Sequence, residues 1–302
     1  MSINSIEYAK KFTTELDKAY TQKAVTGFFA DNILRSKFVG AKTVIVPDLD
    51  FVGLVNYDRT GGFNRAMVTV AQTPFTMSMD RARSISIDRE DMDESGITDL
   101  AGKVLGEYVR TQVVPETDAY VLSKLAGIAN ENNQEVAYDS AKPYETLVNL
   151  VNKVRNVAGF EEELVCFING NIMSDFELSP ELQKMITVSN FKQGEINLNV
   201  KTINGVPIIP VTPERMKTAY TFVESDDTHS AGGFSPDADA KDILMLVLPK
   251  KAASLVKKTE KIRIFTPEQN VDADAYKFDY RIYYDVFVKK SALGSIYASF
   301  EA

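Results

Sequence analysis

The sequence of 302 residues contains no tryptophan, one cysteine and one histidine. A single cysteine excludes an intrachain disulfide, and the lack of paired Cys or His ligands argues against a zinc site. Cys166 stands in the apolar run of residues 164–168, which is typical of a small buried hydrophobe. His229 lies in a polar loop rich in Asp, Ser and Gly, so we expect a surface residue rather than a general base.

Signals for nucleotides, membranes and secretion are also missing. There is no Gly-Lys-Ser/Thr phosphate loop and no strand-linked dinucleotide fingerprint. The N-terminus lacks the basic start and apolar stretch of a secretion signal, and no uncharged apolar run approaches the length of a bilayer. We therefore expect a chain that is made in the cytoplasm and has no membrane partner.

The bulk composition is that of a globular protein, with 44% hydrophobic and 25% charged residues. The formal net charge of -8 argues against a protein whose main task is to grip nucleic acid. Carboxylates cluster in residues 88–99 without the spacing of a calcium loop, which predicts a solvated turn before a helix. No catalytic, metal or cofactor-binding constellation can be assembled, so we predict no enzyme; a carboxylate-dependent hydrolase that uses these acids stays open as an alternative.

Residues 42–88 predict a long two-stranded excursion. Residues 44–47 begin it as a β-branched strand, and apolar and polar residues alternate on the return. Between the strands, the polar stretch of residues 56–65 contains Gly61 and Gly62, which can turn the chain at positive φ. Such a hairpin is too thin to bury a core of its own, so we expect it to be stabilised by lying on another surface, such as a neighbouring chain.

The remaining segments predict a mixed α+β fold without repeats. Helices are expected at residues 5–26, 99–113, 115–130, 143–158 and 249–258. Pro115 is expected to interrupt the chain after the second of these helices and to lie in the first turn of the third. Strands are expected at residues 164–168, 208–211, 243–248, 262–265, 278–288 and 294–300, and a hairpin turn is expected within residues 202–206. The Asn204-Gly205 pair is the strongest hairpin signal, because both residues suit a type I′ turn.

Six segments together carry a likeness to a known family. They are YAKKFTTELDKAYTQKAVTG (8–27), YDRTGGFNR (57–65), FTMSMDRARSISIDREDMDESG (75–96), VVPETDAYVLSKLAG (113–127), INGVPIIPVTPERM (203–216) and ILMLVLPKKAASLVKK (243–258). In this order and spacing they resemble the major capsid proteins of tailed bacteriophages with the Hong Kong 97-type fold. The resemblance is closest to capsid proteins from phages and prophages of low-GC Gram-positive bacteria. None of the segments is a catalytic signature.

The resemblance implies a layout in four parts. An N-terminal arm would occupy residues 1–40, and an extended β-hairpin loop residues 41–88. A peripheral domain with a spine helix would combine residues 89–135 and 243–302, and an axial domain would hold residues 136–242. Because the arm begins at once, we expect a separate scaffolding protein rather than a cleaved scaffolding segment.

The implied function is self-association without catalysis. Hexamers and pentamers of the chain would form an icosahedral shell, the virion capsid, around double-stranded DNA after synthesis in the host bacterial cytoplasm. Further expected partners are a portal and decoration proteins, and contact with packaged DNA would be weak and independent of sequence. No cofactor is expected. A second reading from the same fold is an encapsulin-like compartment that encloses protein cargo.

The resemblance also points to the hairpin tip as the intersubunit contact. The candidate contact residues are Asp58, Arg59, Gly61, Gly62, Phe63 and Arg65. The charged members are expected to form ion pairs at the rim of an interface, where each pair contributes on the order of 0–1 kcal/mol. The binding energy must therefore come from buried area and from repetition around the shell.

Overall fold

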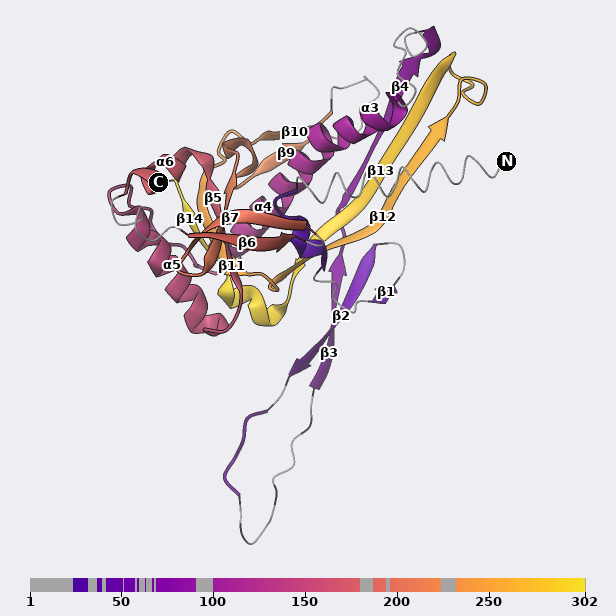
Figure 1. The fold of residues 1–302 in the computed structure, drawn as a ribbon. Helices are drawn as coiled ribbons and strands as arrows, with labels where there is room; N and C mark the ends of the chain where they lie inside the picture. The colour runs from indigo at the N-terminus through magenta and orange to yellow at the C-terminus, as the bar shows by residue number, and fades with distance from the viewer. Residues whose placement is uncertain are drawn as a thin grey trace.

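The structure, a computed structural model, describes residues 24–31, 37–39, 42–50, 52–57, 59, 63, 67, 69–90, 100–179, 187–193, 196–223 and 232–301. A body around a six-stranded sheet gives off two extensions, a β-hairpin and a long ribbon of strands, which point in different directions (Figure 1). The predicted α+β fold class is confirmed.

The six-stranded sheet has the order β14-β11-β5-β8-β7-β6. β5 and β8 pair in parallel, and the other neighbours are antiparallel. Its strands are β5 (Leu164–Asn169), β6 (Thr187–Gln193), β7 (Ile196–Ile203), β8 (Val206–Val211), β11 (Ile243–Pro249) and β14 (Tyr297–Phe300). The β7–β8 turn has φ of 52° at Asn204 and 77° at Gly205, as the predicted type I′ turn requires.

Helices cover both faces of this sheet, because its central strands are apolar on both sides. Along β5, Phe167 packs toward α4 (Val114–Glu131), whereas Cys166 packs toward α5 (Pro143–Ala158). A strand that is buried on both faces has a continuous apolar sequence rather than an alternating one. The predicted strands at residues 164–168 and 243–248 are confirmed as β5 and β11, and burial on both faces explains their continuous apolar sequences.

A second, elongated sheet has the order β12-β13-β4. It consists of β12 (Ala253–Phe265), β13 (Ala275–Val288) and β4 (Met79–Asp88). Alternate residues of β13, among them Tyr280 and Tyr284, lie in the same hydrophobic core as α4 and Phe167. This shared core joins the ribbon to the body.

The predicted interruption at Pro115 is wrong, although Pro115 does lie in the first turn of α4 as expected. α3 (Leu100–Tyr108) continues through a π-helical turn, η2 (Val109–Val113), directly into α4. Proline has no N–H to donate and its ring crowds the carbonyl group of the preceding turn, and the wider π-helical turn accommodates both effects without a break. The result is one long helical rod that runs from the ribbon into the body (Figure 1).

The predicted helix at residues 249–258 is also wrong. The chain turns at residues 250–252 and enters β12, where Leu255 pairs with Val286 and Ile262 with Tyr280. The short apolar run of this segment fits either a helix or a strand. Pairing with β13, which is distant in sequence, decides in favour of the strand.

The predicted hairpin is confirmed for residues 43–50 and 69–76, whereas residues 79–88, expected in its return strand, form β4 and pair with β13. β2 (Thr43–Asp50) and β3 (Thr69–Thr76) pair along their whole length, and β1 (Lys37–Val39) lies beside β2. The hairpin points away from the body, opposite to the ribbon (Figure 1). β3 leads into β4 through Met77 and Ser78.

Shorter elements complete the chain. They are η1 (Gly27–Asp31), η3 (Gly170–Ile172), α6 (Met173–Leu178), η4 (Pro213–Arg215), β9 (Tyr220–Phe222), β10 (Phe234–Pro236) and η5 (Lys290–Ser295). The predicted surface position of His229 falls outside the described residues. So does the predicted helix at residues 5–26, except for residues 24–26. The four-part domain layout stays a prediction; β11 and β14, from the part assigned to the peripheral domain, pair within the six-stranded sheet.

Candidate assembly site

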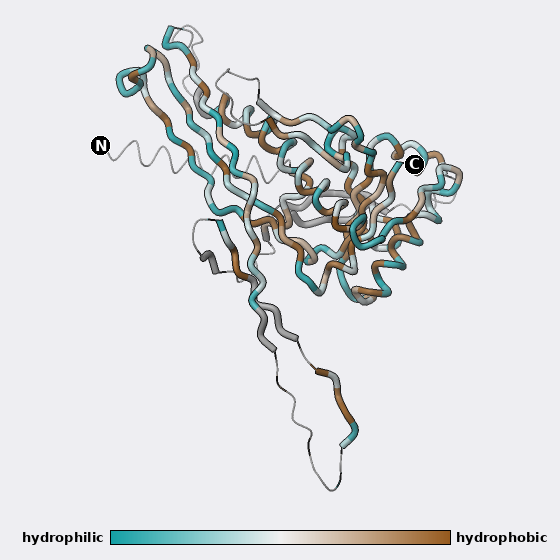
Figure 2. Tube along the Cα trace, turned by 180° about the vertical axis from the view of Figure 1, so that it is seen from behind, coloured by the Kyte–Doolittle hydropathy of each residue, from teal (hydrophilic) through white to brown (hydrophobic). Residues whose placement is uncertain are grey.

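The described residues of the hairpin include large apolar side chains that are exposed to solvent in the subunit. Beyond the paired strands, Leu54 is fully exposed, and Met67 and Phe63 are 90% and 88% exposed. Figure 2 shows residues 52–57 as a mostly hydrophobic stretch at the far end of the hairpin, remote from the body. A monomeric protein rarely exposes a contiguous group of large apolar side chains, so this group indicates a surface for a partner.

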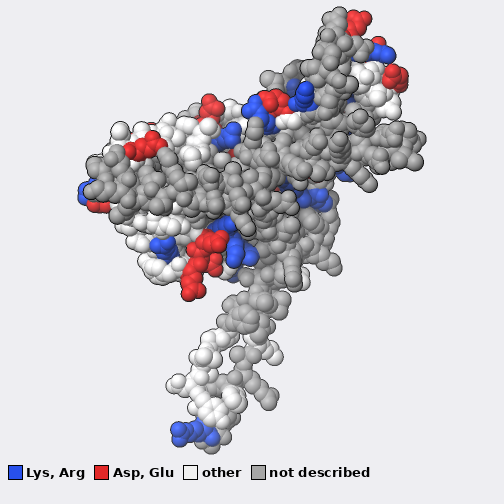
Figure 3. Space-filling model, in the orientation of Figure 1, with Lys and Arg blue, Asp and Glu red and all other residues white. Residues whose placement is uncertain are grey.

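Two of the six predicted contact residues lie in the described part of the chain. Arg59 is exposed, and the Phe63 ring packs edge-on against Tyr57 with ring centroids 5.2 Å apart. In Figure 3 the described atoms of the projecting segment are uncharged except for a basic side chain at its end. Asp58, Gly61, Gly62 and Arg65 fall outside the described residues. The contact role of all six stays a prediction.

The base of the hairpin is fixed to β13 by a small apolar cluster. Val44 and Met77 pack with Tyr283 and Phe287, and the Phe75 ring lies 5.0 Å from the Phe287 ring. The Tyr283 hydroxyl donates a hydrogen bond to the Met77 carbonyl oxygen at 3.1 Å. The hairpin is therefore anchored to β13 at its base.

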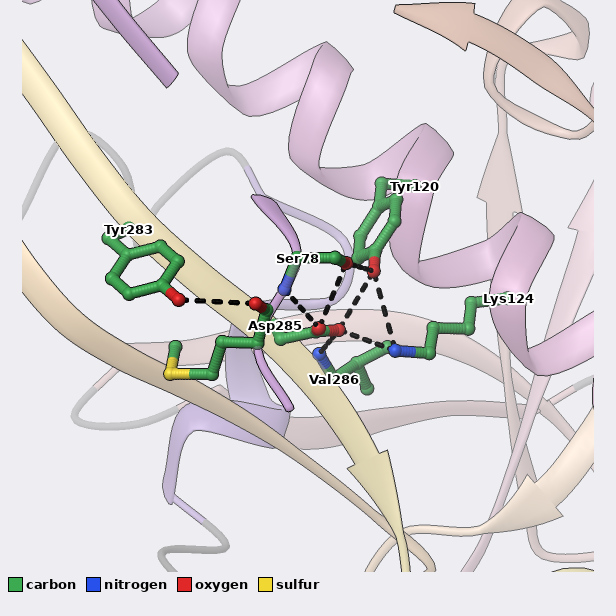
Figure 4. A network of polar contacts seen from close by, with 7 residues as sticks. Ser78, Tyr120, Lys124, Tyr283, Asp285 and Val286 are labelled. Atoms are coloured by element: carbon green, nitrogen blue, oxygen red, sulfur yellow. Dashed lines mark hydrogen bonds and ion pairs between the residues drawn. The ribbon is translucent and has the colours of Figure 1, made fainter. Parts of the chain in front are cut away.

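A buried carboxylate lies beside this cluster (Figure 4). The Asp285 side chain is 0% exposed, and its Oδ2 accepts hydrogen bonds from the Ser78 backbone N–H at 3.0 Å and the Ser78 hydroxyl at 3.1 Å. Its Oδ1 accepts from the Tyr120 hydroxyl at 2.8 Å and pairs with Lys124 Nζ at 2.6 Å. Burial raises the pKa of Tyr120, and the Asp285 charge adds to this effect, so the phenol stays a proton donor. We call these four residues the Asp285 network.

A second polar contact holds β4 against the rod. The Arg81 guanidinium forms a bidentate pair with Glu116 of α4, at 2.6 and 3.2 Å. It also donates to the carbonyl oxygens of Val223 at 2.7 Å and Gly233 at 3.1 Å, which flank residues 224–231. Bidentate pairing fixes direction as well as distance. The strand that continues the hairpin is thus tied to α4 at two places.

A second buried carboxylate holds the start of the described chain. Asp118 of α4 is fully buried and accepts hydrogen bonds from the backbone N–H groups of Val25 and Thr26 and from the Thr26 hydroxyl, the last at 2.6 Å. Arg215 of η4 lies 3.3 Å away. Burial raises the pKa of Asp118 to about 6, although the Thr26 hydrogen bonds and Arg215 oppose the shift.

This raised pKa predicts a pH-dependent stability. The folded chain holds the Asp118 proton up to about pH 6, whereas the unfolded chain releases it near the ordinary aspartate pKa of 3.8. Between these values the folded state binds more protons, so the Asp118 contribution to the unfolding free energy decreases as pH rises from about 4 to 6. A difference of about two pH units corresponds to about 3 kcal/mol.

We expect the unfolding free energy of the wild type, relative to that of Asp118→Asn, to fall by about 3 kcal/mol between pH 4 and pH 7. Denaturant unfolding of the unassembled subunit at a series of pH values measures it. A difference that is constant over this range would contradict the assignment.

The described residues offer little for catalysis. They contain no group of three or more His, Cys, Asp or Glu side chains placed to hold a metal ion. Cys166 is buried, as predicted, and burial raises the pKa of its thiol. Within the acidic stretch, Asp88 accepts a hydrogen bond from the Glu90 N–H, and residues 91–99 fall outside the described part. No helix in that part is long and apolar enough to cross a membrane.

The sequence predicts the hairpin, but neither the exposed apolar residues before its tip nor the buried carboxylates Asp285 and Asp118 were predicted. Val52, Leu54 and Val55 precede the predicted tip, and an apolar group directly before a polar turn is the signal that could have singled them out. Asp285 was one of several polar residues in an alternating strand, and Asp118 was one polar residue in a helix. Nothing local distinguishes a buried carboxylate from a solvated one in these patterns.

Comparison with protein-family models and with curated protein sequences gave no match. Solved structures do match. The mature capsid of bacteriophage PhiM1 aligns at a TM-score of 0.54 and 15% identity, over 86% of this chain and 82% of that chain. The capsid of cyanophage P-SCSP1u aligns at 0.55 and 11% identity, over 88% and 85%. A virus-like particle from Pyrococcus furiosus aligns at 0.54 and 11% identity, over 97% and 99%.

These likenesses, which span most of each chain at low identity, establish the fold. The chain has the capsid fold of tailed-phage shells and of a virus-like particle, the Hong Kong 97-type fold that the sequence resemblance predicts. The closer likeness to phages of low-GC Gram-positive bacteria stays a prediction.

Proposed function

We propose that this chain is a major capsid protein that assembles with copies of itself into the closed shell of a tailed bacteriophage. The observation that carries the proposal is the hairpin, which projects from a capsid fold and whose described residues include exposed apolar side chains far from the body. A surface that is apolar, extended and remote from its own core is suited to cover a second copy of the chain.

The energetics favour many equal contacts. Burial of one large apolar side chain contributes roughly 1.5–3 kcal/mol, so two or three residues from the hairpin contribute a few kcal/mol per contact. Arg59 would add on the order of 0–1 kcal/mol at the rim. Such contacts are weak singly, but every subunit of a closed shell makes several of them. The domain layout, hexamers and pentamers, a separate scaffolding protein, a portal, decoration proteins and weak contact with DNA belong to the same proposal.

Electron microscopy of the purified protein tests this function directly. We expect large closed particles, or hexamers and pentamers that convert to particles when concentrated or co-expressed with a scaffolding protein. Sedimentation would give the same result as a fast-sedimenting species. A chain that stays monomeric at every concentration, with and without scaffold, would exclude the shell.

One observation favours a second candidate, a compartment for protein cargo. The virus-like particle from Pyrococcus furiosus aligns over almost the whole of both chains. The two candidates share the hairpin contact and differ in what the particle encloses. Nucleic acid in particles from infected or induced cells supports the capsid, and a co-purifying enzyme without nucleic acid supports the compartment.

A further inference from the structure

The two oxygens of the Asp285 carboxylate serve two different parts of the molecule. Oδ2 accepts both hydrogen bonds from Ser78, at the junction of the hairpin strand β3 and β4. Oδ1 receives the hydroxyl of Tyr120 and the ammonium group of Lys124, both on α4. The carboxylate itself belongs to β13. One side chain therefore connects the exit point of the hairpin, the long sheet and the helical rod (Figure 4).

A stability role alone does not explain this arrangement. The Asp285 carboxylate is fully buried, whereas the Lys124 side chain is 36% exposed. Removing the carboxylate charge from water is costly, so the pair contributes little net stability compared with apolar residues of the same volume. Tyr283 and Phe287, on the same strand, already provide an apolar contact for the hairpin base. Apolar packing tolerates small rotations, whereas hydrogen bonds are directional. What Asp285 adds to the apolar cluster is therefore a defined direction.

The surroundings of Lys124 also favour one geometry. Its ammonium group lies 5.5 Å from the centre of the Tyr120 ring and 5.6 Å from that of Phe287. The Phe287 ring in turn contacts Phe75 of the hairpin strand. A small rotation of the hairpin would thus disturb the hydrogen bonds of Asp285 and the aromatic contacts of Lys124 together.

We propose that Asp285 is a positioning residue for assembly: through Ser78 on one oxygen and Tyr120 and Lys124 on the other, it sets the angle at which the hairpin leaves the subunit. The proposal rests on the proposed function, because the angle matters only if the hairpin must meet a second copy of the chain. An error at the base is multiplied by the length of the hairpin, so a small rotation at Ser78 displaces the apolar residues 52–57 by much more.

Asp285→Asn tests the proposal with little change in volume. The variant loses the charge that pairs with Lys124, and its amide NH₂ faces groups that are themselves donors. In the isolated subunit, we expect amide hydrogen exchange at residues 73–77 to become at least tenfold faster, while exchange in β5 and β11 changes much less. In assembly, we expect at least a tenfold lower yield of regular particles and a broader distribution of diameters by electron microscopy.

Leu150→Ala is the matched control. Leu150 is fully buried in the core between α5 and the six-stranded sheet, and its loss lowers stability without touching the hairpin or α4. We expect this variant to leave exchange at residues 73–77 and particle diameter unchanged. If Asp285→Asn behaves like Leu150→Ala, its effect is stability alone and the positioning role is wrong.

Milder variants keep the test valid if Asp285→Asn does not fold. Ser78→Ala removes one bond to Oδ2, and Tyr120→Phe removes one bond to Oδ1. Each should accelerate exchange at residues 73–77. The double variant should show less than the sum of the two effects, since the two side chains share the Asp285 carboxylate and their hydroxyl oxygens also lie 3.0 Å apart. Unchanged exchange in both variants would overturn the proposal. A wild type that forms no particles would contradict the proposed function, whereas wild-type particles with indifferent variants would contradict only the role of Asp285.

Discussion

The double variant Leu54→Asp with Tyr57→Asp is expected to form no particles while its subunit stays folded. Both side chains are exposed in the subunit, Leu54 fully and Tyr57 to 60%, so their replacement costs the fold little, within about 0.5 kcal/mol. In a shell the same positions would lie against a neighbouring copy. There the variant loses the burial of two large side chains, roughly 3–6 kcal/mol, which weakens each contact by about two to four orders of magnitude.

Because every subunit repeats this contact, assembly should be lost rather than reduced. Sedimentation and electron microscopy measure the particles, and denaturant unfolding confirms that the subunit is intact. Phe160→Asp is the matched control, since Phe160 is 72% exposed in the turn after α5 and outside the hairpin. Normal particles from the double variant, or equal loss of particles from Phe160→Asp, would show that the hairpin surface is not the assembly contact.

The strands of the body could be predicted because their signals are local. Residues 164–168 and 243–248 are continuous apolar runs, as strands buried on both faces require. The Asn204-Gly205 turn is set by the two residues themselves, which adopt positive φ. The hairpin of β2 and β3 followed from strand signals on both sides of a polar stretch. The resemblance then arranged these parts into the capsid fold, which the comparisons confirm.

The two errors in the fold arose where contacts distant in sequence override local preference. The local pattern of residues 249–258 predicts a short helix, yet residues 253–258 belong to β12 because β13 offers this strand a partner along its whole length. Pro115 suggested a break, yet the core shared by Val109, Val113 and Leu122 holds the rod together through the π-helical turn. Helix propensity predicts the structure of a segment poorly when that segment buries a long apolar face in the folded protein.

The candidate site was predictable only in outline. A hairpin that is too thin to bury a core of its own must pack on another surface, which predicts that the intersubunit contact lies on the hairpin. The Asp285 network and the Asp118 contacts join residues that are at least 90 positions apart in sequence: Ser78 with Asp285, and Thr26 with Asp118. No spacing rule connects such residues. They become visible only when three elements meet at one carboxylate.

Phe167→Ala is expected to give the largest loss of subunit stability. The ring is fully buried in a central strand and lies 6.1 Å from the Phe28 ring and 6.2 Å from the Phe29 ring, between centroids. Removal of a buried phenyl group costs about 3–5 kcal/mol, because the surrounding core closes the cavity only in part. This is a large share of a typical unfolding free energy of about 5–15 kcal/mol. Denaturant unfolding of the unassembled subunit measures the loss.

The same variant separates two ways of holding η1. Phe28 and Phe29 attach this turn to the core through Phe167, and Asp118 attaches the residues just before it through the Val25 and Thr26 N–H groups. Because both contacts hold one short segment, we expect Phe167→Ala and Asp118→Asn to be non-additive, with the double variant less destabilised than the sum of the single ones. Strict additivity, together with unchanged hydrogen exchange at residues 27–31 in Phe167→Ala, would mean that the aromatic contact does not hold η1 and that Asp118 alone keeps this segment on α4.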